Sequence, residues 1–250
     1  MYVCFCLGDM YMKKVLQAII ILFISLNLYA QTFEGIGDFR IGMSFSDFKV
    51  WANSKQLPII QMNTWQAVSL RGSSSGMWIY EPVHNKNKPE NTPKDVNYVD
   101  GVTVVILNSY SVSDINIDRL KFTFLNDVLI NIYSEFSNEL EFALTAKYGN
   151  PRVENSSSSI TCRSNFTGVS VTKSETMKRM YWRNDVIIAM GYDSSYYSNS
   201  CDLLKKRFLH ISDEEKYLKY YRQNERGQIT FAEDLKNKKM NELKNKLGDL

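Results

Sequence analysis

The chain contains one short string twice, and this string is typical of a tight β-hairpin. Residues 124–130 read FLNDVLI, and residues 182–188 read WRNDVII. In both copies Asn-Asp lies between aromatic and β-branched residues, and these two residue types tolerate the positive φ angles of a two-residue hairpin turn. Antiparallel strand pairing is therefore the strongest constraint on the fold.

A two-residue turn also fixes which residues face each other across a hairpin. For the first hairpin the predicted pairs are Phe124–Leu129, Leu125–Val128, Phe122–Asn131 and Thr123–Ile130. For the second hairpin the predicted pairs are Trp182–Ile187 and Met180–Ala189. Both faces of the first hairpin carry apolar residues, so we expect a sheet that is covered on one side and only partly solvated on the other.

Two segments that precede the hairpins have the start and stop signals of α-helices. Ser44 and Asp47 form a capping-box pattern, and the apolar spacing after them predicts a helix over residues 45–55. Residues 137–151, SNELEFALTAKYGNP, predict a second helix that ends before its glycine and proline. The apolar face of this second helix consists of Leu140, Leu144 and Tyr148.

Each helix is followed by a β-rich stretch, and this order predicts the α+β class. The further strand candidates are residues 65–70, 77–83, 101–107 and 203–211, and residues 82–93 form a proline-containing loop. The sequence predicts two helix-then-antiparallel-sheet units, over residues 31–136 and 137–211. The repeated string makes an internal duplication one interpretation. The other is that Asn-Asp is simply a common hairpin turn.

Residues 212–250 predict a C-terminal helical segment made of two helices. Ser212 with Glu215 forms a capping box for a helix that ends near Gln223, and Thr230 with Glu233 forms another. The last helix has an apolar stripe of Leu235, Met240, Leu243 and Leu247. Its lysines are expected to form a solvated face rather than a binding patch: Lys236, Lys238, Lys239, Lys244 and Lys246.

The N-terminal residues have the pattern of a secretory signal peptide. Lys13 and Lys14 precede an apolar run over residues 15–30, and cleavage is expected between Ala30 and Gln31, with Met12 as an alternative start. A transmembrane anchor is the competing interpretation, but the run is shorter than the roughly 20 apolar residues that a span needs. The prediction is a periplasmic or extracellular protein without a membrane span after cleavage.

The composition gives no support for a nucleic-acid partner or for a disordered chain. The formal net charge is +3, which gives no electrostatic case for nucleic acid as a partner. Aromatic residues make up 13% of the chain, which is too many for a disordered protein.

Export into an oxidising compartment predicts a disulfide between Cys162 and Cys201, the two cysteines that follow the leader. Two separate buried thiols are the alternative.

Catalytic and metal-binding signatures are mostly missing. Ser74 lies in a GSSSG string and is followed by Asp202 and His210, but the expected strand after Ser74 excludes a nucleophile elbow, which needs a helix there. His84 lies in the proline-containing loop. No metal or cofactor motif is present. The acidic residues near the second helix start are explained by the helix dipole: Glu135, Glu139 and Glu141.

Two phrases in the sequence resemble small secreted α+β proteins of the bacterial envelope. The opener FRIGMSFSDF and the string LTAKYGNP are similar to phrases in outer-membrane assembly lipoproteins and in modules like the β-lactamase inhibitor protein. The matching positions are Gly42, Met43, Ser44, Asp47, Lys147, Tyr148, Gly149 and Pro151. The chain departs from the lipoproteins because no lipobox cysteine follows the leader. The resemblance implies protein–protein binding in the periplasm without catalysis, and it carries over no functional residue.

The leading hypothesis is a secreted, non-catalytic protein- or ligand-binding module of the cell envelope. A secreted hydrolase with a carboxylate pair is the alternative, since such pairs leave no readable spacing. A purely structural component of the envelope is the third hypothesis. Residues 191–200, GYDSSYYSNS, form the candidate recognition loop, in which Tyr192, Tyr196 and Tyr197 would bind. The competing interpretation is an ordinary turn whose tyrosines pack back on the sheet. Residues 82–93 are the next candidate surface.

Overall fold

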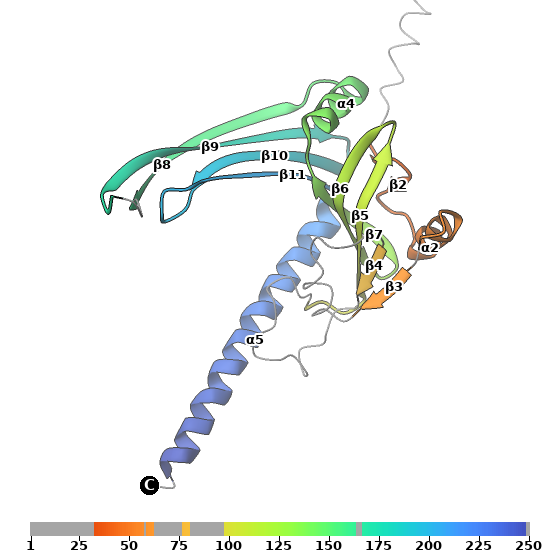
Figure 1. Cartoon of the computed structure of the whole chain (residues 1–250). Coiled ribbons are helices and arrows are strands. Elements are labelled where there is room, and N and C mark those ends of the chain that lie inside the picture. The colour runs from red at the N-terminus through yellow and green to blue at the C-terminus, as the bar shows by residue number, and fades with distance from the viewer. Residues whose placement is uncertain (1–32, 58, 63–76, 81–97, 164–166, 249–250) are drawn as a thin grey trace, which may run out of the picture. The chain divides into compact units, whose positions relative to one another are not determined.

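The computed structural model describes residues 33–57, 59–62, 77–80, 98–163 and 167–248 (Figure 1). The described elements confirm the α+β class with antiparallel strands. In chain order they are β1 (Gly35–Ile36), β2 (Phe39–Arg40), α2 (Phe45–Ser54), β3 (Ile59–Met62), β4 (Met77–Tyr80), β5 (Val102–Val112), β6 (Ile115–Leu125), β7 (Val128–Glu135), α4 (Asn138–Tyr148), β8 (Arg152–Arg163), β9 (Ser170–Arg183), β10 (Ile187–Tyr197), β11 (Leu203–Asp213) and α5 (Glu214–Gly248).

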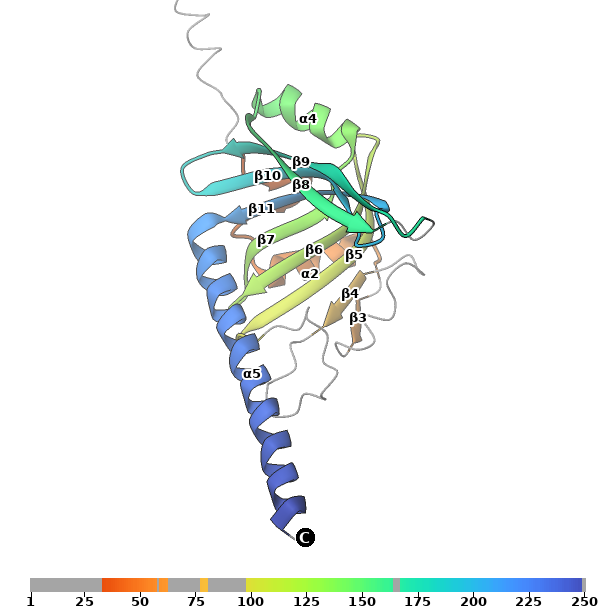
Figure 2. The ribbon, with the colours of Figure 1, turned by 90° about the vertical axis from the view of Figure 1, so that its left-hand side faces the viewer.

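Strands β3 to β11 form a single sheet in the order β3-β4-β5-β6-β7-β11-β10-β9-β8 (Figure 2). All described pairings in this sheet are antiparallel except β3 with β4, which is parallel. The strands of the two predicted units meet where β7 pairs with β11. The predicted strand over residues 65–70 and the loop over residues 82–93 lie outside the described residues.

The first hairpin has the predicted turn but only part of the predicted register. Asn126 and Asp127 have φ angles of 49° and 68°, and the pairs Phe124–Leu129 and Leu125–Val128 are confirmed. Beyond them the register shifts, so Phe122 faces Ile132 and Thr123 faces Asn131, and the two predicted pairs there were wrong. The cause is one extra residue in β7, Ile130, which a two-residue turn alone cannot reveal.

The second copy of the string forms a different turn, and the predicted register was wrong. Trp182 pairs with Ala189, and Met180 pairs with Gly191. The side-chain oxygen of Asn184 accepts hydrogen bonds from the amides of Val186 (3.1 Å) and Ile187 (2.7 Å). Because the Asn184 side chain satisfies these two amides, the turn closes without positive φ angles. The loop between the paired residues is therefore longer than two residues.

The main core lies on the sheet face that α2, the β1–β2 hairpin and α4 cover (Figure 1). As predicted, Ser44 caps α2 and its hydroxyl accepts from the Asp47 amide at 3.0 Å. Phe48 on α2 then lies 5.1 Å from the Phe122 ring and 5.4 Å from the Phe124 ring, between centroids. The second helix also matches its prediction, because α4 ends where Gly149 adopts a φ angle of 83°.

The C-terminal segment is one helix, α5, and the prediction of two helices was wrong. Ser212 belongs to β11 and is buried, while the Asp213 carboxylate accepts from the Lys216 amide at the helix start. Gly227 lies within the helix and does not interrupt it. A larger residue at this position would collide with Tyr98, because its Cβ atom would lie 2.4 Å from the Tyr98 Cβ. A single glycine costs only about 1 kcal/mol in a helix interior.

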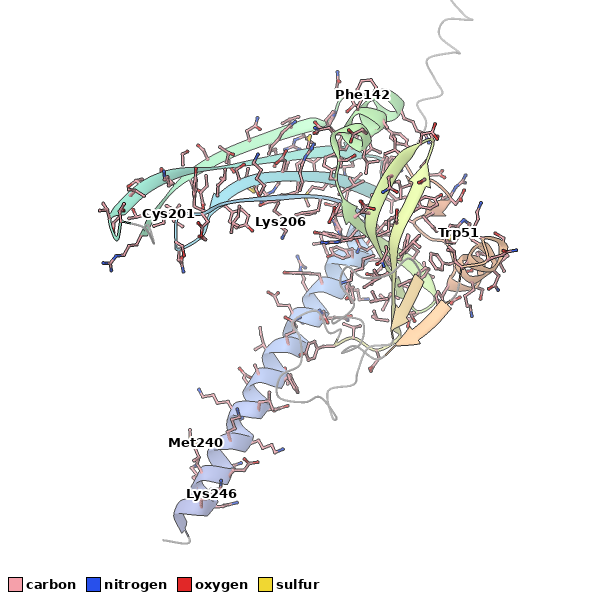
Figure 3. The ribbon with its side chains drawn as sticks, in the orientation of Figure 1. Trp51, Phe142, Cys201, Lys206, Met240 and Lys246 are labelled. Carbon is pink, nitrogen blue, oxygen red and sulfur yellow. A yellow bond between two sulfur atoms is a disulfide. The ribbon has the colours of Figure 1, made fainter. Side chains whose placement is uncertain are left out.

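The first half of α5 packs on the sheet face opposite the main core. The Tyr217 ring lies 4.4 Å from the His210 ring, between centroids. Tyr220 is buried against Val102, Val104 and Ile130. Asn224 accepts a hydrogen bond of 2.6 Å from the Tyr98 amide. The second half of α5 is mostly exposed, and the side chains of Met240 and Lys246 extend from it (Figure 3).

The packing of His210 under α5 predicts a pH dependence of stability. Burial lowers the pKa of His210 from 6.5 to about 4. Between pH 6.5 and pH 4, His210 is protonated in the unfolded chain but neutral in the folded protein. His210 therefore costs no stability above pH 6.5, and stability is lost as the pH falls toward 4. A shift of this size is worth about 3 kcal/mol in total.

We expect His210→Phe to remove this dependence while it keeps a ring against Tyr217. From pH 7 to pH 5 the free energy of unfolding should fall by about 2 kcal/mol more in the wild type than in the variant. Urea unfolding at both pH values measures the difference. Equal losses in the two proteins would show that His210 is not buried as described.

Candidate functional site

Strands β8, β9, β10 and β11 extend past α4, and their outer parts are not covered by a helix in either view (Figures 1 and 2). Side chains of a strand alternate between the two sheet faces, so these four strands present two different surfaces. We call them the polar face, which is on the side of α4, and the aromatic face, which is on the opposite side.

The polar face consists of two rows of side chains that cross all four strands. Strand pairing aligns Asn155, Lys178, Asp193 and Arg207 in one row, and Ser157, Thr176, Ser195 and Lys205 in the next. These rows line an open hollow of about 790 Å³. Because its floor is polar and charged, the hollow would favour a polar ligand rather than an apolar one.

Glu141 organises the charges at the inner end of the polar face. Its carboxylate pairs with Lys178 at 3.1 Å and with Arg207, whose Nε lies 3.0 Å from the Asp193 carboxylate. The helix dipole alone does not account for Glu141, because this residue ties α4 to β9 and β11. Lys178 and Arg207 are thereby held in place and partly neutralised, which weakens the case for binding an anion.

The other two acidic residues of this cluster have separate surroundings. Hydrogen bonds from its own backbone amide and from the Ser137 hydroxyl lower the pKa of Glu139, as expected for a carboxylate at a helix N-terminus. Glu135 pairs with Arg119 at 3.2 Å. The three carboxylates are thus engaged in a cap and in ion pairs, which accounts for them without a catalytic role.

The aromatic face is defined by Tyr133, Tyr192, Tyr196, Leu204 and Phe208. The Phe208 ring lies between two tyrosines, with its centroid 4.6 Å from that of Tyr192 and 5.1 Å from that of Tyr133. The interplanar angles are 21° and 26°, so the three rings stack. Their strands, β10, β11 and β7, are neighbours in the sheet. The result is a continuous row of half-buried rings.

Toward the outer end of the strands the same face becomes more exposed. Tyr196 pairs directly with Leu204 across β10 and β11, and these side chains are 37% and 40% exposed. The Lys206 ammonium lies 5.2 Å from the centroid of the Phe208 ring, and its side chain projects from β11 (Figure 3). The aromatic residues of this face, tyrosine and phenylalanine, are of the types that are enriched in protein interfaces.

The predicted recognition loop is a strand, and this part of the prediction was wrong. Residues 191–197 belong to β10. Serine does not end a strand when both neighbouring strands satisfy its backbone, and tyrosine favours sheets. Strand alternation then separates the three tyrosines. Tyr192 and Tyr196 lie on the aromatic face, whereas Tyr197 points to the other side and has the Lys173 ammonium 5.8 Å from its ring centroid.

The remaining sequence candidates are distributed as follows. Ser74 and His84 lie outside the described residues. Asp202 accepts a hydrogen bond of 3.1 Å from the Ser198 hydroxyl, and His210 is covered by α5. Phe208 and Tyr133 were missed, because nothing local in the sequence indicates that their strands are neighbours of β10.

Cys162 and Cys201 form a disulfide, with 5.2 Å between their Cα atoms. The bond connects the end of β8 to the loop between β10 and β11, at the outer end of both faces. The Arg163 amide also donates a 3.1 Å hydrogen bond to the Asn199 carbonyl beside it. These two links hold the outer ends of β8, β10 and β11 together where no helix supports them.

Among the described residues, no group of three or more His, Cys, Asp or Glu side chains is placed to hold a metal ion. None of the described helices combines the length and the apolar character that a membrane crossing needs. A scan against protein-family models and searches of curated proteins and of solved structures found no match.

The disulfide predicts a large stability difference between the oxidised and the open protein. Its sequence separation is 39 residues, and closing such a loop stabilises by about 4 kcal/mol in the chain-entropy model. We expect Cys162→Ser with Cys201→Ser to lower the free energy of unfolding by about this amount in denaturant titration. Thiol titration of the denatured, unreduced wild type should find no thiol from these two residues. Two reactive thiols would contradict the bond.

Proposed function

We propose that this protein is an exported, non-catalytic binding module that recognises a protein of the cell envelope through the aromatic face. The observation that carries this proposal is the row of stacked rings of Tyr133, Phe208 and Tyr192, continued by Tyr196 and Leu204. Large side chains in contiguous, partly exposed positions on one sheet face mark an interaction surface rather than scattered surface apolarity.

The rings are also suited to binding because they are already ordered. Stacking and strand pairing hold Tyr192 and Phe208 in one conformation, so a partner need not fix them at an entropic cost. Tyrosine supplies a large contact area with only two side-chain torsions and keeps a hydroxyl for hydrogen bonding. Ser194 lies between the two tyrosines of β10 and is buried, so a partner would meet the rings, Leu204 and the Lys206 ammonium beside Phe208.

The polar face supports this function less well. Its two central cations, Lys178 and Arg207, are engaged with Glu141 and Asp193. An incoming ligand would have to compete with those ion pairs. The same pairs leave no observation that favours a hydrolase with a carboxylate pair, because Glu141 and Asp193 neutralise neighbouring cations rather than face an empty centre.

Export is proposed on the signal-peptide pattern of residues 1–30 and on the envelope-protein phrases around Met43 and Tyr148. The disulfide is consistent with an oxidising compartment. Residues 1–32 lie outside the described residues.

An internal duplication also stays a proposal. It is supported by the order of elements, since α2 and α4 each precede antiparallel strands and the last strands, β7 and β11, pair with each other. The repeated string gives it no support. One copy connects β6 to β7, the last two strands of its half, whereas the other connects β9 to β10, the middle two of its half.

The aromatic face is tested by Tyr196→Ala with Leu204→Ala. Both side chains are more than a third exposed, so the melting temperature should change little, whereas affinity for the partner should fall by at least about 30-fold, or 2 kcal/mol. The partner is first captured from an envelope fraction by the immobilised wild type and identified. Its affinity for each purified variant is then measured by calorimetry.

The matched control is Ser157→Ala with Thr176→Ala on the polar face of the same strands. It should bind the identified partner as the wild type does. If the aromatic-face variant binds normally and the polar-face control does not, the binding site lies on the polar face. Turnover in a broad hydrolase screen, with no partner captured, would contradict a binding function.

Export predicts a defined mature N-terminus. Intact mass and N-terminal sequencing of the protein from its native cells should find a chain that begins at Gln31 and is released without detergent. A chain that retains residues 15–30 and stays with the membrane would instead support the anchor interpretation.

A further inference from the structure

Strand β8 is the last strand of the nine-stranded sheet, and its outer edge is long and regular. All residues of Arg152–Arg163 pair with β9 without a register shift. Among the described residues, β9 is the only strand that pairs with β8. One side of the β8 backbone therefore presents a row of amide and carbonyl groups that no described strand uses.

This edge lacks the devices that normally protect an edge strand. Native proteins block such edges with proline, with lysine, with bulges or with very short strands. Residues 155–162 read NSSSSITC and carry no charge and no proline. The run from Ser156 to Ser159 is exposed, and its small side chains do not shield the backbone from an approaching strand.

The edge is also rigid, which lowers the entropy lost on pairing. Cys162 is held by the disulfide to Cys201, at the far end of the strand. Next to it, the Arg163 amide donates to the Asn199 carbonyl, and the Arg163 side-chain Nε donates to the Gly168 carbonyl at 2.8 Å. A strand fixed in the extended conformation can accept a partner strand without first being ordered.

We propose that β8 pairs antiparallel with β8 of a second copy of this chain, about a twofold axis perpendicular to the sheet at Ser158. Such an axis places residues on the same face opposite each other. The facing pairs between the copies are then Ser158–Ser158, Ser157–Ser159, Ser156–Ile160, Asn155–Thr161 and Glu154–Cys162. The pairing ends there, because the Arg163 amide is already bonded to the Asn199 carbonyl. Glu154 faces an uncharged residue in this register, and serines face each other at the centre.

A second copy fits this edge better than a foreign peptide. Strand addition gains its specificity from pockets that accept alternate side chains of the peptide. The middle of β8 offers only serine side chains for that purpose. In a symmetric dimer, specificity comes instead from the repeated register itself, because an isologous interface needs only a self-complementary patch.

The dimer would join two sheets into one and would place both aromatic faces on the same side. Two recognition surfaces on one side allow both copies to bind a partner array or a repeated partner at once. This consequence rests on the proposed function, whereas the β8 pairing itself does not. If binding through the aromatic face fails its test, the β8 dimer can still be tested. If the dimer fails its test, binding can still be tested.

A charge-swap experiment tests the pairing. Ser157→Lys with Ser159→Lys places ammonium groups opposite each other twice across the axis, and Ser157→Glu with Ser159→Glu does the same with carboxylates. Within one copy these positions face the uncharged Thr176 and Ser174 of β9, so the fold should persist. By sedimentation velocity the wild type should be a dimer, each variant alone a monomer, and their equimolar mixture a dimer again.

The control adds the same charge away from the edge. Thr172→Lys with Thr176→Lys, both on β9, face the uncharged Thr161 and Ser157 of β8 and should stay dimeric. Circular dichroism checks that every variant is folded. As a second measurement that does not depend on charge, oxidised Ser158→Cys should form a covalent dimer, since directly facing Cα atoms lie about 4.5–5.5 Å apart. Thr176→Cys should remain unlinked.

A wild type that stays monomeric at about 100 µM, where a dimer with a Kd of about 1 µM would be mostly formed, overturns the proposal. So does a dimer that persists in the lysine variant, or a mixture of the two charged variants that fails to reassociate. Cross-linking of Thr176→Cys with equal yield would show that contact between copies is random rather than centred on Ser158.

Discussion

The pairing of β7 with β11 is the contact on which the rest of the structure depends. It places Ile132 opposite Ile211, both almost fully buried, although their strands are separated by α4 and three other strands along the chain. This one antiparallel pair converts two groups of strands into a single sheet. It thereby creates the continuous core beneath α2 and α4, and on the other face it brings Tyr133 beside Phe208. Without it, neither the core nor the aromatic face would be contiguous.

The helices then decide which parts of the sheet remain available for binding. α4 covers the inner part of β9 and β11 and is tied to them by Glu141. The first half of α5 covers the opposite face at His210 and, through Tyr220, at Val102, Val104 and Ile130. Beyond both helices, strands β8 to β11 are held together by their backbone pairing and by the Cys162–Cys201 disulfide. The uncovered surface is therefore where the ordered rings, the polar rows and the β8 edge are found together.

The corrections to the sequence predictions share a physical cause, namely that local signals do not report contacts between distant segments. The string with Asn-Asp forms two different turns, because in the second copy the Asn184 side chain donates to the distant Phe33 carbonyl and accepts from the amides that follow it. The register of the first hairpin shifts at Ile130, whose side chain is buried with Tyr220 of α5. Gly227 lies inside one continuous helix, where Tyr98 occupies the space that its missing side chain leaves.

The sequence alone determined the α+β class, the bounds of α2 with its Ser44 cap, the bounds of α4, the turn at Asn126-Asp127 and the pairing of Cys162 with Cys201. These features depend on signals within a few residues, or on there being only two cysteines after residue 30. The tertiary structure alone decided that Tyr192 and Tyr196 share a face with Phe208 and Tyr133, and that Tyr197 does not. The reason is that strand order and register are fixed by burial and backbone pairing across long separations, and these leave no local trace in the residues that they bring together.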